Sequence, residues 1–279
     1  MRAAVVGLGL IGGSLAMALK GYPGLSVTGV VRSEATLRQA VERQVCDQVT
    51  MDPVEAIGQA DLVWLCMPPK AILSFLEEHK GNFQPGTIVT DVCGVKTAVM
   101  QAARTLPDTV DFIGCHPMAG KETSKLDNAE AGLFQNAHFI LTPRPESDPA
   151  HIALLEDMAR HMGFRDVVRT TAQEHDAMIA YTSQLMHVLA VAVCDDPELE
   201  RCTGFEGGSF RDCTRVAALD VPLWTELFSL NAPALSQSIA RLEDNLRAYR
   251  RVLETGNTQL LEEKLTASSA RKRRMTRSS

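Results

Sequence analysis

A glycine-rich turn within the first dozen residues constrains the fold of this chain more than any other feature. The run Gly7-Leu8-Gly9-Leu10-Ile11-Gly12 follows a short apolar stretch, Ala3–Val6, and opens a segment with helical character. In that context the first glycine permits a tight turn, the second lets the backbone approach a pyrophosphate, and the third lets helix and strand pack closely. Free N–H groups at the start of such a helix attract phosphate. The motif therefore predicts a dinucleotide site formed by Gly7, Gly9, Leu10, Ile11 and Gly12.

Short apolar strands alternate with helical segments through the first half of the chain. The predicted strands are Ala3–Val6, Leu25–Val31, Leu62–Cys66, Thr87–Thr90, Phe112–Gly114 and Val167–Val168. This alternation is typical of a parallel sheet with helices on both faces. We predict an α/β fold whose N-terminal domain, residues 1–170, is a Rossmann-type, doubly wound, mostly parallel sheet. Loops at the carboxyl ends of its strands line one crevice, so Met67 and Pro68 are expected to contact the dinucleotide.

The second half of the chain has a helical pattern. Apolar residues recur at helical spacing in Ala172–Val193 and again in Leu223–Glu254. We predict an all-helical domain over residues 171–265 that binds substrate. Because long helices with large apolar faces often pack against a twin, we also expect a homodimer formed through this domain. Residues 266–279 are expected to form a basic, frayed tail.

Composition and charge exclude several functional classes. The formal net charge is −6 although the tail is strongly basic, which makes the body of the chain a poor surface for nucleic acid. No apolar run is expected to be long enough to cross a bilayer, and the first residues lack the cleavage site of a signal peptide. The seven scattered cysteines form no CxxC pair, so we expect no metal site and no disulfides. We predict a cytoplasmic protein that acts on a small molecule and contacts neither membrane nor nucleic acid.

The end of the second predicted strand bears on the choice of cofactor. Domains that bind NAD usually place Asp or Glu there for the ribose hydroxyls, whereas a nearby Arg accommodates the 2′-phosphate of NADP. The run Val27–Ser33 contains no acidic residue and ends in Arg32 and Ser33. This pattern favours NADP over NAD, although a solvated surface arginine would give the same sequence.

Four stretches of the chain resemble the prephenate/arogenate dehydrogenase family. They are Gly114–Glu122 (GCHPMAGKE), Leu133–Pro143, Tyr181–His187 (YTSQLMH) and Ser209–Asn231, which contains SFRDCTRVA. The resemblance runs in order from Gly7 to about Glu254. It implies an enzyme of tyrosine biosynthesis that converts prephenate to 4-hydroxyphenylpyruvate by oxidative decarboxylation, with hydride transfer to NAD(P). The alternative that it leaves open is the conversion of arogenate to tyrosine.

His116 is the expected catalytic base. Oxidation of a carbinol by hydride transfer needs a group that takes or polarises the hydroxyl proton, and a neutral histidine suits this role near pH 7. His116 ends a predicted strand, Pro117 follows it, and it matches the family's catalytic histidine. The resemblance also makes Glu122 a functional acid that pairs with the substrate-binding arginine.

The resemblance assigns the substrate side of the site to the helical half. Arg215 corresponds to the substrate-binding arginine, and a guanidinium suits bidentate recognition of a carboxylate. Arg211 lies four residues earlier and is the residue with which it is most easily confused. His187 corresponds to a histidine that contacts the substrate side chain, although a lone histidine on an apolar helix is more often a core residue.

Two positions depart from the family pattern. Gly94 stands where many members have a serine that bonds the catalytic histidine and the substrate hydroxyl, and that bond would then come from water, the Cys93 thiol or the ribose. Gln184 stands where several members have histidine. Both changes affect how the substrate side chain is recognised, and so whether the site suits prephenate or arogenate. Both residues are therefore counted as substrate-binding. Lys96 follows the same loop, where it would meet phosphate or substrate or else lie on the surface.

Two other functional classes compete with this interpretation. β-Hydroxyacid dehydrogenases share the layout of two domains but use a catalytic lysine on a helix of the second domain, and residues 142–279 contain only Lys264 and Lys272. A non-catalytic dinucleotide sensor would keep the glycine motif but would not need four further residues together, namely His116, Glu122, His187 and Arg215. The sequence therefore favours the dehydrogenase over both.

Overall fold

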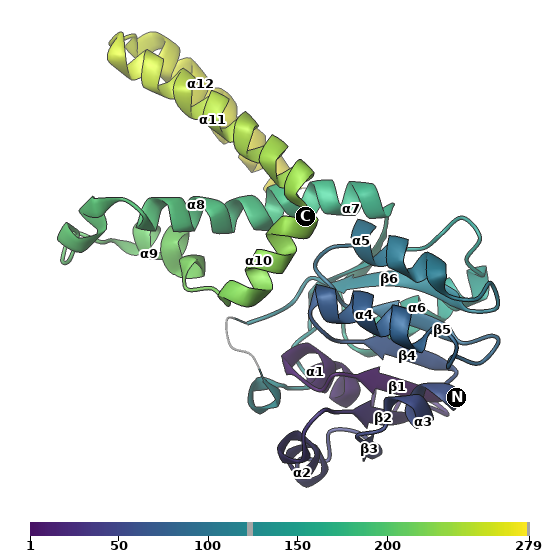
Figure 1. Ribbon diagram of the computed structural model, residues 1–279. Helices are drawn as coiled ribbons and strands as arrows, with labels where there is room; N and C mark the ends of the chain where they lie inside the picture. Colours follow the sequence, from purple (N-terminus) through teal and green to yellow (C-terminus); the bar gives the residue numbers. More distant parts are fainter. Residues whose placement is uncertain (122–124, 278–279) are drawn as a thin grey trace. The chain divides into compact units, whose positions relative to one another are not determined.

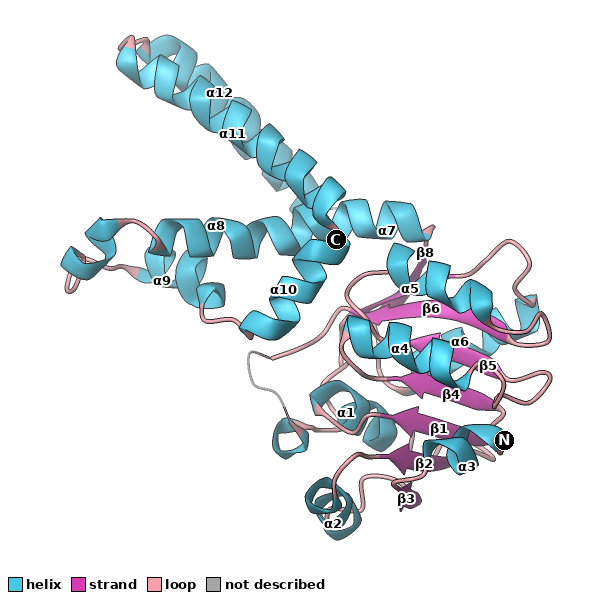
Figure 2. Cartoon of the chain, viewed as in Figure 1, coloured by secondary structure: helices cyan, strands magenta, loops and turns pink. Residues whose placement is uncertain are grey.

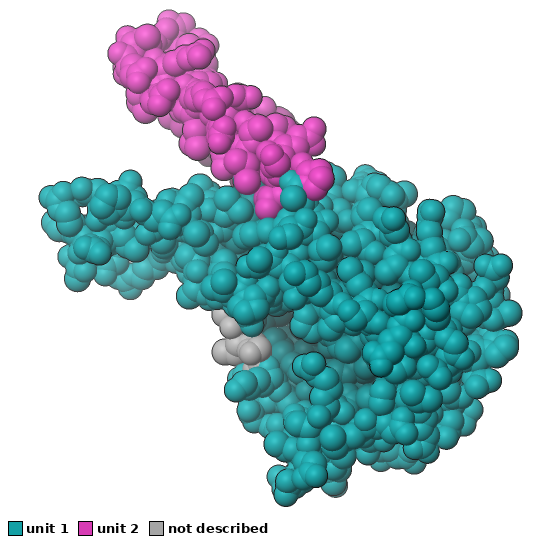
Figure 3. Space-filling view, viewed as in Figure 1, with its two compact units in different colours: residues 1–232 teal, residues 233–279 magenta. Residues whose placement is uncertain are grey.

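The computed structural model describes residues 1–121 and 125–277. The chain forms two compact units, Met1–Ala232 and Pro233–Ser279, which Figure 3 shows in different colours. The first unit contains the whole sheet together with the helices that follow it as far as residue 230. The domain boundaries at residues 170 and 265 stay predictions.

An eight-stranded sheet forms the centre of the first unit (Figure 1). Its strands lie in the order β3-β2-β1-β4-β5-β6-β7-β8, and every neighbouring pair is parallel except β6 and β7. The order runs outward in both directions from β1 and β4, which confirms the predicted doubly wound, mostly parallel sheet. The strands are β1 (Arg2–Val6), β2 (Ser26–Val30), β3 (Gln48–Thr50), β4 (Leu62–Leu65), β5 (Ile88–Asp91), β6 (Asp111–Pro117), β7 (His138–Thr142) and β8 (Asp166–Arg169). The prediction missed β3 and the antiparallel β7.

Helices cover both faces of the sheet (Figure 2). Residues alternate along each strand, so that in β4 Leu62 and Trp64 join one apolar cluster while Val63 and Leu65 join the other. Helices α1 and α6 contribute to the first cluster, and α3, α4 and α5 to the second. The six helices of this part of the chain are α1 (Leu10–Ala18), α2 (Glu34–Glu42), α3 (Pro53–Gly58), α4 (Pro69–His79), α5 (Thr97–Ala102) and α6 (Pro149–His161).

A helical segment follows the sheet within the same unit. It consists of α7 (Ala172–Ile179), a π-helical turn (Ala180–Gln184), α8 (Leu185–Cys194), α9 (Gly208–Thr214) and α10 (Val221–Leu230). Short 3-10 turns occur at Ala103–Thr105, Leu126–Asn128, Pro197–Arg201 and Arg215–Ala217.

The continuous helix Ala172–Cys194 corrects one sequence expectation. The helix is 23 residues long, and an 18-residue stretch within it has a mean hydropathy of 1.6, so by length and composition it could cross a bilayer. His175 and Asp176 lie near its start. Both of these side chains are buried in polar contacts with the sheet end of the same unit, and 28% of the apolar stretch is buried within the protein.

The second unit is a pair of helices, α11 (Ala232–Glu254) and α12 (Thr258–Arg277). The turn between them contains Gly256, whose φ of +62° favours glycine. Lys264 lies over the Tyr249 ring, and the Tyr249 hydroxyl is 3.3 Å from Ser268 Oγ. The segment that was expected to fray from residue 266 is therefore helical to Arg277. Its Ala, Arg and Lys residues favour helix, and its first turns pack on α11.

Candidate functional site

The glycine turn after β1 is shaped to admit a dinucleotide. Gly7 has a φ of +98°, and a Cβ at this position would lie 2.5 Å from the Cys66 carbonyl oxygen. A Cβ at Gly12 would lie 1.9 Å from the carbonyl oxygen of Gly7, so the third glycine is needed for the close approach of helix and turn. At Gly9, by contrast, a Cβ would have no atom within 4 Å. The space in front of Gly9 and the N-terminus of α1 therefore fits a pyrophosphate group.

The other residues predicted to contact the cofactor surround this turn. Met67 follows β4, and its Cγ would be 3.1 Å from a Cβ at Gly7. Pro68 is the N-cap of α4. Arg32 is exposed just after β2, and the Ser33 hydroxyl accepts a hydrogen bond from the Thr36 amide at the start of α2. Leu10 and Ile11 form the first turn of α1.

His116 lies near the carboxyl end of β6 and begins a chain of three side chains. Its Nδ1 is 2.8 Å from Nε2 of His175, and Nδ1 of His175 is 2.8 Å from Oδ1 of Asp176. The Asp176 carboxylate also accepts hydrogen bonds from the backbone amides of Lys96 and Thr97, at 2.7 and 2.8 Å. Asp176 thereby ties α7 to the start of α5.

The positions of the protons follow from the ionised end of this chain. Burial acts to raise the pKa of Asp176, but the hydrogen bonds from His175, Thr97 and Lys96 outweigh it and the pKa is lowered. Since a carboxylate only accepts, Nδ1 of His175 donates to it, and Nε2 of neutral His175 then accepts from Nδ1 of His116. Nε2 of His116 is left with its lone pair.

Both histidines are held neutral. The pKa of His116 lies well below the usual 6.5, first because of burial and then because His175 and Lys96 would repel its positive charge. Burial also lowers the pKa of His175, and Asp176 opposes that shift. A largely enclosed His116 that is neutral near pH 7 is suited to accept a proton.

The loop after β5 forms the wall in front of His116. Lys96 is fully buried and pairs with the fully buried carboxylate of Asp91, so the interpretation of Lys96 as a surface residue is wrong. Asp91 also accepts from the Cys93 amide. A Cβ at Gly94 would lie 3.9 Å from Nε2 of His116, which places Gly94 beside the proton-accepting atom. Burial raises the pKa of Cys93 to about 12, so this side chain remains a thiol.

Helix α10 connects the His116 region with His187. Leu227 packs on Gly94, with 3.3 Å between its Cδ2 and a Cβ at that position. One turn earlier, Trp224 stacks on the His187 ring with 3.6 Å between centroids. His187 is half-buried, its Nδ1 donates to the Ser183 carbonyl at 3.0 Å, and burial lowers its pKa.

The amide of Gln184 is engaged within the protein. It is buried, its Nε2 donates to the Leu227 carbonyl at 3.2 Å, and its Oε1 accepts from Asn231 at 2.8 Å. Asn231 also donates to the Asp176 carbonyl at 2.9 Å. Gln184 therefore supports the wall that α10 forms, and its predicted contact with substrate stays a prediction.

Two family models match nearly the whole chain. Residues 15–168 match "Prephenate dehydrogenase, nucleotide-binding domain", and residues 171–267 match "Prephenate dehydrogenase, dimerization domain". The chain belongs to the prephenate dehydrogenase family. It is 34% identical to a cyclohexadienyl dehydrogenase of Zymomonas mobilis, over 88% of this chain and 86% of that protein. It is 30% identical to a prephenate dehydrogenase of Bacillus subtilis, over 88% of this chain and 69% of that protein.

Solved structures agree with this family assignment. A Synechocystis arogenate dehydrogenase superposes with a TM-score of 0.85 at 32% identity, covering 98% of this chain and 99% of that one. An Aquifex aeolicus prephenate dehydrogenase, solved with hydroxyphenyl propionate and NAD+, superposes with a TM-score of 0.88 at 25% identity, covering 99% and 98%. A 3-hydroxyisobutyrate dehydrogenase of Mycobacterium tuberculosis, with a TM-score of 0.53 at 15% identity, shares only the fold.

Three further residues were predicted or considered for the substrate site: Arg215, Arg211 and Glu122. Arg215 is exposed at the start of the turn Arg215–Ala217, which packs against α8, the helix that carries His187. Arg211 is exposed on α9 and donates to the Glu206 carbonyl at 3.2 Å. Glu122 lies outside the described residues. The roles of these three residues stay predictions.

The sequence analysis missed the two residues that hold His116. His175 and Asp176 lie on α7, 59 positions or more beyond the catalytic histidine, and only the folded chain brings them together. One signal was available. Glu174, His175 and Asp176 are three titratable residues at the start of an otherwise apolar helix, where burial is costly unless they have partners.

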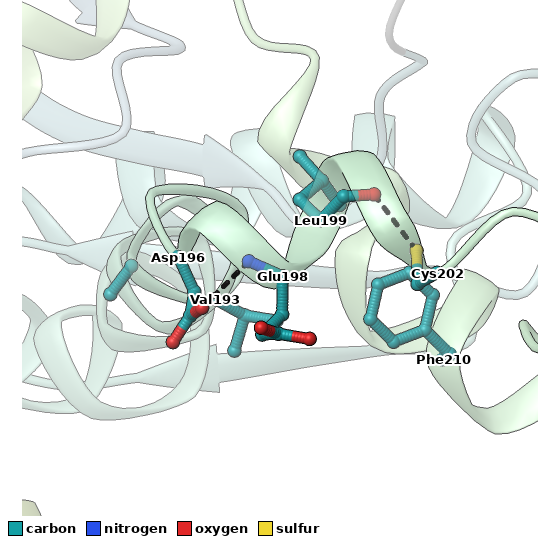
Figure 4. A pocket seen from close by; sticks show the side chains of 7 residues that line it. Val193, Asp196, Glu198, Leu199, Cys202 and Phe210 are labelled. Atoms are coloured by element: carbon teal, nitrogen blue, oxygen red, sulfur yellow. Dashed lines mark hydrogen bonds between the residues drawn. The ribbon is translucent and has the colours of Figure 1, made fainter.

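A separate cavity of about 410 Å³ lies at the far end of α8 and contains none of these residues (Figure 4). Val193, Leu199 and Phe210 supply its apolar walls. Asp196 accepts from the Glu198 amide, and Cys202 donates to the Leu199 carbonyl, so its polar groups are largely used in local turns.

Substituting Gly9→Ala should weaken dinucleotide binding and leave folding intact. The new methyl group meets no protein atom but occupies the space assigned to the pyrophosphate. A clash of this kind costs roughly 1–3 kcal/mol, which is about tenfold or more in affinity. The measurement is a fluorescence titration with reduced dinucleotide together with a thermal melt. Gly12→Ala is the matched control and should lower the melting temperature, because its methyl group would clash with Gly7. Unchanged affinity in Gly9→Ala would place the pyrophosphate elsewhere.

Proposed function

We propose that this chain converts prephenate to 4-hydroxyphenylpyruvate by oxidative decarboxylation, as a step of tyrosine biosynthesis. The observation that carries the proposal is the lone pair on Nε2 of His116, which the hydrogen bonds to His175 and Asp176 direct toward Gly94. The named relatives support the same chemistry. They also keep arogenate, which would give tyrosine directly, as the alternative substrate.

The residues of the site suit this reaction. The bound dinucleotide, NADP or NAD, accepts the hydride. His116 draws the ring hydroxyl proton toward Nε2 while the carbinol carbon is oxidised. The ring carboxylate leaves as carbon dioxide because its loss makes the ring aromatic. Arg215 and His187 are proposed to bind the substrate carboxylate and side chain, with Glu122 pairing with Arg215.

We propose NADP as the preferred cofactor, with NAD as the alternative. Arg32 is exposed directly after β2, and the Ser33 and Thr36 hydroxyls lie 2.9 Å apart at the first turn of α2. A guanidinium and two hydroxyls at this place suit a 2′-phosphate. The Aquifex relative was solved with NAD+, which is why the alternative is kept.

We also propose a homodimer formed through the helical half. Residues 171–267 match a domain described by its dimerization, and several large apolar side chains on these helices are exposed. On α11, Leu246 and Leu253 are 55% and 63% exposed and lie two turns apart on one face. Exposed apolar side chains that share one helix face are typical of a protein interface.

The substrate and cofactor can be decided by four assays of reduced dinucleotide formation, which pair prephenate or arogenate with NADP or NAD. Turnover should be fastest with prephenate and NADP. Arg32→Ala should raise the KM for NADP about 10-fold or more, as loss of a charge-assisted hydrogen bond does, and should leave the KM for NAD unchanged. Arg38→Ala is the control, because Arg38 lies on the adjoining helix α2 but pairs with Glu34. No turnover in any assay by folded, dinucleotide-binding protein would overturn the proposed function.

His116→Asn should reduce kcat by about 100-fold or more without weakening dinucleotide binding, as expected for loss of a general base. The wild-type pH profile gives a second check. Because the pKa of His116 is lowered in the folded protein, this residue keeps its proton-accepting form as the pH falls through 6.5. The value of kcat/KM should therefore begin to fall only below pH 6.5. Near-normal turnover of His116→Asn would contradict the assignment, and His138→Asn, at the exposed start of β7, is the control.

Sedimentation should give a mass twice the 30.4 kDa of the chain. Leu246→Glu combined with Leu253→Glu should shift the protein toward monomer, because burying two carboxylates at an interface is unfavourable. The control is Met51→Glu, which changes an exposed apolar residue of the nucleotide-binding half and should leave the mass unchanged. A wild-type monomer, or a dimer unaffected by the paired substitution, would contradict an interface on this face.

A further inference from the structure

His175 is a buried titratable side chain to which the proposed reaction assigns no chemical role. It is 1% exposed and lies between two polar groups, His116 and Asp176, at 2.8 Å on each side. A purely structural partner for His116 would need only one hydrogen-bond acceptor. His175 differs from such a partner because it can take a proton on Nε2 while its Nδ1 already donates to a carboxylate.

We propose that His175 and Asp176 form a proton relay: when His116 takes the substrate proton, its own Nδ1 proton moves to His175 and is held there until a proton returns to the product. The inference rests on the proposed function. It extends the role of the histidine pair from orientation to proton storage.

The step balances without another reactant. The substrate O–H bond breaks as Nε2 of His116 gains the proton, and the Nδ1 proton of His116 moves to Nε2 of His175. The hydride leaves the carbinol carbon for the dinucleotide, and the ring carboxylate leaves as carbon dioxide, with its bonding electrons entering the ring. The phenolate oxygen then takes a proton back from His116, which recovers its Nδ1 proton from His175. No proton is released overall.

The charges around the two rings favour His175 as the place where the proton is held. His116 is faced by His175 and by the ammonium of Lys96, and both disfavour a cation there. His175 is faced by Lys96 as well, but also by Asp176 in direct contact and by Asp91. A proton on His175 therefore forms an ion pair with Asp176 at 2.8 Å, in surroundings where such a pair is screened little.

The relay can be separated from simple orientation by His175→Gln. A glutamine can accept from Nδ1 of His116 and donate to Asp176, so it keeps the orientation of His116 but cannot take up a proton. The rate of reduced dinucleotide formation in a single turnover should fall about 10- to 100-fold, within the range of general acid–base contributions. In mixtures of light and heavy water, the wild-type rate should show the curved dependence of two moving protons, and the variant the linear dependence of one.

His138→Gln is the matched control, because His138 also pairs with an aspartate, Asp166, but this pair is exposed at the start of β7. Asp176→Asn is the second variant and should also slow the single turnover, with a thermal melt to confirm folding. A wild-type rate and a curved dependence in His175→Gln would overturn the relay while leaving the proposed function intact. Absence of turnover by the wild-type enzyme would overturn both.

Discussion

The carboxylate of Asp176 is the point on which the arrangement of the site depends. It accepts hydrogen bonds from two backbone amides at the start of α5 and from Nδ1 of His175, so this one side chain joins α7 to the start of α5. These hydrogen bonds outweigh the cost of burial and keep the group ionised. Because an ionised carboxylate only accepts, its charge sets the direction of every hydrogen bond as far as Nε2 of His116.

A buried ion pair stabilises the loop after β5, which lies beside His116. Lys96 and Asp91 are both fully buried and pair within the loop that carries Gly94. A buried pair of this kind adds little net stability, but loss of one partner costs roughly 3–5 kcal/mol because the other charge is left unpaired. The pair therefore fixes the path of the loop, and with it the position of Gly94 beside Nε2 of His116. Burial lowers the pKa of His116 most, and His175 and this lysine lower it further, so the loop contributes to both the shape and the protonation of the site.

Helix α10 closes this arrangement from the helical half. Its Leu227 packs on Gly94, its Trp224 stacks on His187, and the Glu226 carboxylate accepts from the Lys70 amide at the start of α4. A serine at position 94 would need space next to Leu227, where a Cβ is already in close contact. Gly94 and the packing of α10 are thus matched to each other.

The sequence by itself determined the parts of this protein that rest on local patterns. Strand–glycine–helix spacing predicted the dinucleotide turn, apolar alternation predicted six of the eight strands of the sheet, and the motif around His116 predicted the family. Tertiary structure decided the rest. His116 contacts His175, and Gln184 bonds to Asn231, although the members of each pair are distant in the chain. Lys96 is buried because it pairs with the charge of Asp91. Local periodicity carries no information on such contacts, because burial and proton direction are set by whichever groups the fold brings together.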